Sequence, residues 1–72
     1  MTGYSPLELA IARAGSEAKL AGKIGYSQHA VWHAKRRGRV SAEMAVAIDK
    51  FTEGEVSKEM LRPDLFGLKD IG

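Results

Sequence analysis

Four side chains that can hydrogen bond to or stack on nucleic-acid bases fall close together in the sequence, at Gln28, His29, Trp32 and His33. A glutamine amide can pair bidentately with the N6 and N7 edge of adenine, which is worth roughly 1–3 kcal/mol of discrimination. The imidazoles can donate to guanine or to phosphate, and the indole can pack on a thymine methyl group or a sugar. If these side chains share an exposed helix face, they can read base pairs.

A basic run follows directly, and it consists of Lys35, Arg36, Arg37 and Arg39. Residues 18–42 carry six basic residues and no acidic one, whereas residues 43–72 carry seven acidic residues against four basic ones. Cationic side chains bind phosphates whatever the base, so we expect this run to supply affinity more than sequence choice. Three serines at predicted helix starts are expected to fix the register on the phosphate backbone: Ser16, Ser27 and Ser41.

The sequence contains few residues that could form a catalytic site or a metal site. His29 and His33 are four residues apart and could share a metal ion, but a metalloprotease helix needs a glutamate directly after the first histidine, and Ala30 stands there. There is no cysteine, neither histidine has a carboxylate nearby in sequence, and no glycine-rich phosphate loop occurs. We therefore expect no enzyme, no metal and no cofactor.

The elements that must position these side chains are helices. Between the glycines, apolar residues recur at helical spacing, which predicts an all-α fold. Serine caps and glycine stops predict helices from Ser5 to Gly15, from Ser16 to about Lys23, from Ser27 to about Arg37, from Ser41 to Gly54, and a short one over 57–61. Ser5 is followed by proline and, three residues on, by Glu8, which is the capping-box pattern.

The second and third helices are separated only by residues 24–26, which forces a sharp turn with a central glycine. Ala21 is small where the two helices must approach, and Gly25 suits a positive φ. Val31 and Ala34 are expected to face inward. This spacing predicts a helix-turn-helix over roughly residues 16–37, whose third helix presents its first half to the major groove of DNA.

The remaining apolar residues are expected to build one small core, with Met44 and Met60 filling gaps. Its predicted members on the flanking helices are Leu7, Ala10, Ile11, Ala14, Leu20, Ile24, Ala45, Ile48 and Phe51. Pro63 is expected to break the last helical run and to keep Arg62 out of helical conformation. Leu61, Leu65 and Phe66 are expected to hold the tail on the core, with residues 67–72 loose.

The chain has 72 residues, which allows a single domain over 1–72. The lack of cysteine is compatible with a reducing cytosol, and no apolar run is long enough for a signal or membrane segment. We expect a cytoplasmic protein with no membrane partner.

From Leu7 to Phe66 the sequence resembles the small Cro-type phage regulators, and most closely the YdaS-like family of antitoxins and prophage Cro homologues. The resemblance rests on the apolar pattern of 7–16, on the turn sequence of 20–31, on Arg37-Gly38-Arg39-Val40 and on the ending of 61–66. It implies a lambda-repressor-like domain of four to five short helices that binds operator DNA as a repressor, with a homodimer on a palindrome.

One position departs from that family. Its members usually carry a tryptophan two residues later, where this chain has Ala34. Trp32 therefore either faces DNA or belongs in part to the core, and the sequence leaves both open.

Two functions follow as expectations. The first is a sequence-specific transcriptional regulator that reads double-stranded operator DNA. The second is an antitoxin or protein-interaction module that binds a toxin or another protein through the acidic C-terminal segment.

Overall fold

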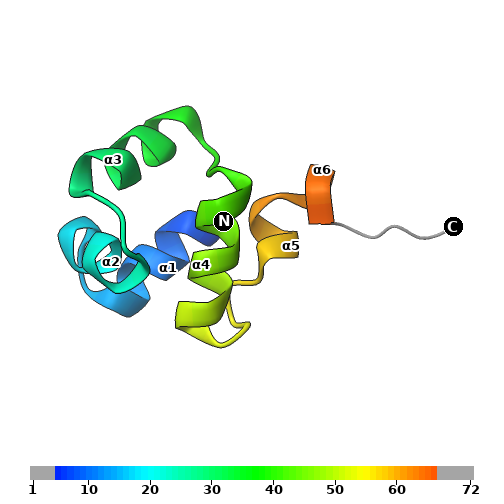
Figure 1. The fold of residues 1–72 in the computed structure, drawn as a ribbon, viewed down its shortest axis with the longest axis horizontal. Helices are drawn as coiled ribbons and strands as arrows, with labels where there is room; N and C mark the ends of the chain where they lie inside the picture. The colour runs from blue at the N-terminus through cyan, green and yellow to red at the C-terminus, as the bar shows by residue number, and fades with distance from the viewer. Residues whose placement is uncertain (1–4, 67–72) are drawn as a thin grey trace, which may run out of the picture.

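The structure, a computed structural model, describes residues 5–66, which form six helices. They are α1 Pro6–Ala14, α2 Glu17–Ile24, α3 Gln28–Arg37, α4 Ala42–Thr52, α5 Lys58–Leu61 and α6 Pro63–Phe66. Figure 1 shows α2 and α3 on one side of the molecule, α4 in the middle, and α5 and α6 on the other side. The predicted all-α class is confirmed, with one short helix more than expected. The predicted loose tail, 67–72, lies outside the described residues.

The helix starts follow from local hydrogen bonds. The first five helices each begin at a serine whose hydroxyl accepts from the backbone N–H three residues on, and these serines are Ser5, Ser16, Ser27, Ser41 and Ser57. The O···N distances are 3.1–3.2 Å. At α1 the Glu8 carboxylate accepts in return from the Ser5 N–H. Each such cap stabilises its helix by about 1 kcal/mol, and the predicted starts are confirmed.

The core forms where α1, α2, α4 and α5 meet and where α3 packs on α2. Leu20, Val31 and Ile48 are fully buried at its centre. The other buried apolar residues are Leu7, Ala10, Ala21, Ala34, Val40, Met44, Ala45, Val56 and Leu61, and the predicted Ile11, Ala14, Ile24 and Phe51 pack against them as partly buried residues. Within residues 5–66 no helix is long and apolar enough to cross a membrane.

The C-terminal segment differs from its prediction in three places. Met60 and Leu65, expected in the core, are 44% and 53% exposed. Leu61 and Phe66 do hold the segment on the core, so the short helices α5 and α6 turn their other faces to solvent. Pro63 does interrupt the run, because Arg62 takes φ −134° and ψ 70°, but it also starts α6, since proline is tolerated in the first turn of a helix.

The junction between α4 and α5 is fixed by two side chains of α4. The buried Thr52 hydroxyl donates to the Ile48 carbonyl at 2.9 Å and accepts from the Val56 N–H at 3.0 Å. The Asp49 carboxylate accepts from the N–H of Lys58, the first residue of α5, at 2.9 Å. The left-handed residue that ends α4 is Glu53, with φ 54°, one position before the predicted glycine.

Candidate nucleic-acid interface

The turn between α2 and α3 sets the direction in which α3 projects. Gly25 has φ 79° and ψ 28°, and the Tyr26 N–H donates to the Ala21 carbonyl at 2.9 Å across the turn. Val31 and Ala34 are buried on the inner side of α3. This is the helix-turn-helix geometry that the spacing predicted over roughly 16–37, and the burial of one side leaves the other side of α3 at the surface.

All four residues expected to read bases are exposed on α3: Gln28, His29, Trp32 and His33. Trp32 is 41% exposed, whereas Ala34, where the resemblance led us to expect a tryptophan, is 6% exposed. Trp32 therefore lies at the surface and not in the core, and its contact with DNA stays a prediction.

Trp32 organises the side chains around it. Its ring stacks on His29 at a centroid distance of 5.7 Å and an interplanar angle of 17°, and it meets His33 edge-on at 5.1 Å. The guanidinium of Arg36 lies 4.9 Å above the indole. The two imidazoles meet at 3.0 Å between their Nε2 atoms. We call these four residues, His29, Trp32, His33 and Arg36, the α3 cluster.

A shallow hollow opens at the start of this face, lined by Gln28, His29 and Trp32. In this hollow the Gln28 amide, which can hydrogen bond to a base edge, lies beside the rings of His29 and Trp32, which can contact an apolar group. A thymine methyl group beside an adenine edge has this combination of chemistry.

The members of the basic run have different partners. Lys35 pairs with Glu17 of α2 at 3.2 Å, and Arg36 belongs to the α3 cluster. Arg39 lies 4.0 Å from Asp64 of α6. Arg37 is exposed and takes part in none of the ion pairs found among residues 5–66. The sequence predicted the charge of this segment, but the fold gives each member a different environment.

The three serines expected at the phosphate backbone are all helix caps, as described above. Ser27 and Ser41 are exposed and Ser16 is half-buried. In each case the oxygen accepts from its own helix, so the hydroxyl hydrogen is left to donate to another acceptor.

A network around Arg62 connects the end of the α3 segment to α6, and sequence reasoning missed it. Arg62 donates from Nη1 to the Val40 carbonyl at 2.9 Å and from Nη2 to Asp64 at 2.6 Å. Nε of Arg62 also donates to Asp64 at 2.9 Å, and the hydrogen bonds from Arg62 to this carboxylate lower the pKa of Asp64 from 3.8 to about 2. The Arg62-Pro63-Asp64 sequence was the available signal, because the restricted Arg62 backbone places its side chain beside the carboxylate two residues on.

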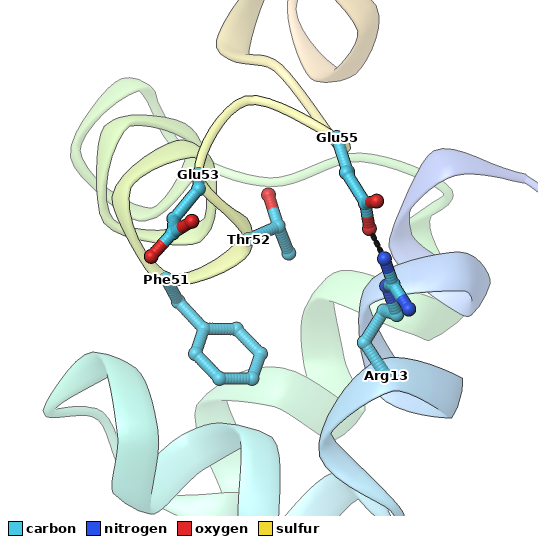
Figure 2. A pocket seen from close by; sticks show the side chains of 5 residues that line it. All are labelled: Arg13, Phe51, Thr52, Glu53 and Glu55. Atoms are coloured by element: carbon cyan, nitrogen blue, oxygen red, sulfur yellow. Dashed lines mark ion pairs between the residues drawn. The ribbon is translucent and has the colours of Figure 1, made fainter.

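A second hollow lies away from α3, between the end of α1 and the loop after α4 (Figure 2). Its lining residues are Arg13, Phe51, Thr52, Glu53 and Glu55. Arg13 and Glu55 form an ion pair across it, and the Thr52 hydroxyl is already hydrogen bonded within the fold. No residue of α3 lines this hollow, so it adds nothing to the α3 face.

Comparison with known proteins gives two matches. The model of the family described as "Bacterial toxin YdaS" matches residues 7–69. The solved structure of the Cro protein from prophage element Xfaso 1 of Xylella fastidiosa strain Ann-1 is 38% identical in sequence and superimposes with a TM-score of 0.84, covering 90% of this chain and 100% of that one. No curated protein sequence matches the chain.

Proposed function

This chain belongs to the YdaS family of prophage Cro-like proteins, and from that premise we propose that it is a sequence-specific transcriptional regulator that binds operator DNA through α3. The observation that carries the proposal is the exposed face of α3, which holds Gln28 and the α3 cluster on a helix that projects from a helix-turn-helix. The major groove of B-DNA, about 12 Å wide, admits one such helix.

The bases are read by the first half of α3. Gln28 pairs with the N6 and N7 of an adenine, and His29 and His33 donate to guanine or to phosphate. Trp32 supports the imidazoles by stacking and offers its remaining surface to a thymine methyl group. Because the rings already contact one another, little side-chain freedom is lost when DNA binds.

The phosphates are held by the residues that flank this face. Arg37 and Arg36 carry the largest share, because Lys35 and Arg39 already have carboxylate neighbours. The caps Ser16, Ser27 and Ser41 donate to the backbone and fix the register. By occupying its operator the protein excludes polymerase, and this role requires neither catalysis nor a cofactor.

The test compares a base-reading residue with a phosphate-binding one, after the preferred site has been selected from random DNA. Gln28→Ala is expected to weaken binding to that site by about 1–3 kcal/mol and to leave random DNA nearly unchanged. Arg37→Ala is expected to weaken both about equally and to reduce the salt slope by about 1. Gel-shift titrations at several salt concentrations measure both.

Glu59→Gln is the matched control, because Glu59 is exposed on α5, on the side of the molecule opposite α3 (Figure 1). It should bind both DNAs as the unchanged protein does. Equal losses on selected and random DNA for Gln28→Ala would contradict the assignment, and so would the absence of any shift at low salt.

A homodimer on DNA is part of the proposal, because one reading helix covers one half-site and two-fold partners reach successive grooves roughly 34 Å apart. The outer face of α4 suits this contact. Val46 and Ala47 form its apolar centre, between Glu43 one turn before and Lys50 one turn after, and Phe66 borders it. A second copy related by a two-fold axis at Val46 and Ala47 runs antiparallel, so each Glu43 meets the partner's Lys50.

A second candidate function is favoured by the description of the matching family, which names a toxin. In this alternative the chain acts in a toxin–antitoxin pair and binds a partner protein through its acidic part, in which residues 43–72 carry seven acidic residues. Co-purification with the product of a neighbouring gene, together with no shift of any DNA at low salt, would favour it. Growth arrest on expression would identify the chain as the toxin.

A further inference from the structure

We propose that His29 and His33 form a two-histidine site for a Cu²⁺ or Ni²⁺ ion, and that a bound ion weakens operator binding by occupying the reading face of α3. The first half of this proposal stands on the imidazole geometry alone. The second half rests on the proposed function. A metalloprotease site remains excluded by sequence, but a regulatory ion needs fewer ligands.

The two imidazoles already have the separation that a metal ion requires. Their Nε2 atoms are 3.0 Å apart, and the ring planes are perpendicular, at 89°. Imidazole nitrogens bind divalent ions at about 2.0–2.1 Å, so two of them at right angles around one ion lie about 2.9 Å apart. Tetrahedral coordination would require about 3.4 Å. The observed spacing therefore fits neighbouring positions of a tetragonal ion, the geometry of Cu²⁺ and Ni²⁺.

The site is open to solvent and incomplete. Both histidines are exposed, and among the described residues no third histidine, cysteine or carboxylate joins them. Water must fill the remaining positions, which makes binding reversible. The order of affinity should follow the general series for nitrogen ligands, with Cu²⁺ above Ni²⁺ and Ni²⁺ close to Zn²⁺.

An ion at this position would interfere with base reading in two ways. It replaces the hydrogen bond between the two Nε2 atoms and holds both of them, so that neither can turn to a base or a phosphate. It also places coordinated water between α3 and the groove floor, beside the hollow that Gln28, His29 and Trp32 line. Cognate binding should therefore weaken more than binding to random DNA, which depends on phosphate contacts.

Trp32 provides a direct measurement without DNA. It is the single tryptophan of the chain and its ring lies 5.1 Å from His33 and 5.7 Å from His29, so Cu²⁺ or Ni²⁺ held by the pair quenches its fluorescence. Untagged protein titrated with either ion should show saturable quenching at one ion per chain, reversed by EDTA. His33→Gln should weaken the apparent affinity at least about ten-fold, because the second imidazole is offered at high effective concentration.

Arg36→Gln is the control, since it removes the guanidinium above Trp32 and leaves both imidazoles in place. It should bind the ion at least as tightly as the unchanged protein. Circular dichroism checks that both variants fold. Quenching that is equally strong in His33→Gln, or that never saturates, would overturn the metal site.

The regulatory half is tested by gel shift on the selected operator with saturating Ni²⁺ and with EDTA. Ni²⁺ is expected to weaken operator binding by at least about ten-fold in the unchanged protein. The double variant His29→Gln/His33→Gln loses two base-reading side chains and should bind the operator more weakly, but its remaining affinity should be the same with Ni²⁺ and with EDTA. An unchanged operator affinity with the site saturated would overturn the regulatory role. If no DNA shifts under any condition, the proposed function fails, while the fluorescence titration still decides the metal site.

Discussion

Single residues on α3 have roles that depend on which way they point. Ala34 is buried on the inner side of the helix, whereas Trp32 lies at the surface, where it stacks on His29. An exposed indole held by two imidazoles and a guanidinium is a rigid surface rather than a mobile one. Trp32 is therefore the residue that organises the proposed reading face.

The lowered pKa of Asp64 predicts how the stability of the protein depends on pH. Arg62 lowers the folded pKa of Asp64 to about 2, below the ordinary value of 3.8, so the ionised carboxylate favours the folded state. That stabilisation is fully present above about pH 4 and is lost as the pH falls through about 2. Asp64→Asn should lower Tm near neutral pH, and the difference from the unchanged protein should shrink as the solution is acidified.

Thermal unfolding followed by circular dichroism, from about pH 6 down to about pH 2, measures this difference. Glu59→Gln on α5 serves again as the control, and its difference should not follow the same course. A Tm difference for Asp64→Asn that stays constant over the whole range would show that the Arg62 hydrogen bonds do not favour the ionised carboxylate in the folded state.

At the scale of the element, the turn between α2 and α3 depends on one backbone conformation. Gly25 has φ 79°, and a Cβ added there would meet no atom within 4 Å. Any cost of a side chain at this position is therefore torsional, since space is available. Gly25→Ala is expected to lower the free energy of unfolding by about 1–2 kcal/mol, measured by urea denaturation.

Gly22→Ala is the matched control on the preceding turn of the chain. Gly22 lies inside α2, and a Cβ there also meets nothing within 4 Å. Because alanine favours the helix over glycine, this substitution should stabilise by up to about 1 kcal/mol. The two glycine-to-alanine substitutions should therefore change the free energy of unfolding in opposite directions. A change in the same direction for both would argue against the left-handed turn at Gly25.

At the scale of the whole molecule, the proposed dimer depends on the outer face of α4. Val46→Glu places a charge at the two-fold axis, so the variant is expected to sediment as a monomer. Its affinity for an operator with two half-sites should fall, whereas its affinity for a single half-site should not change. Leu9→Glu is the matched control and should remain a dimer. Leu9 lies on α1, and its exposed fraction is 38%, close to the 36% of Val46.

The charges at the ends of that face allow a stricter check. Glu43→Lys and Lys50→Glu should each weaken the dimer, because each sets like charges against each other, and the double variant should restore it. Failure of the double variant to recover dimerisation, or loss of the dimer in Leu9→Glu, would place the contact elsewhere.

The sequence by itself determined the starts of the first five helices and the turn between α2 and α3. The serine caps accept from backbone N–H groups three residues away, so they need no distant partner. The positive φ at position 25 is adopted without strain by glycine, so the turn also follows from the local sequence. The charge of the segment 35–39 was equally readable. A buried Val31 followed from spacing within a single helix.

Only the tertiary structure decided the features that need residues far apart in the chain. It placed Trp32 at the surface and exposed Met60 and Leu65 to solvent. It also gave Lys35 and Arg39 acidic partners on different helices, α2 and α6. The helices α5 and α6 are too short to show a clear hydrophobic periodicity. The helices on which they pack therefore decide which of their side chains are buried. The 3.0 Å contact between His29 and His33 likewise depends on rotamers that the neighbouring indole favours, and residue spacing does not fix these.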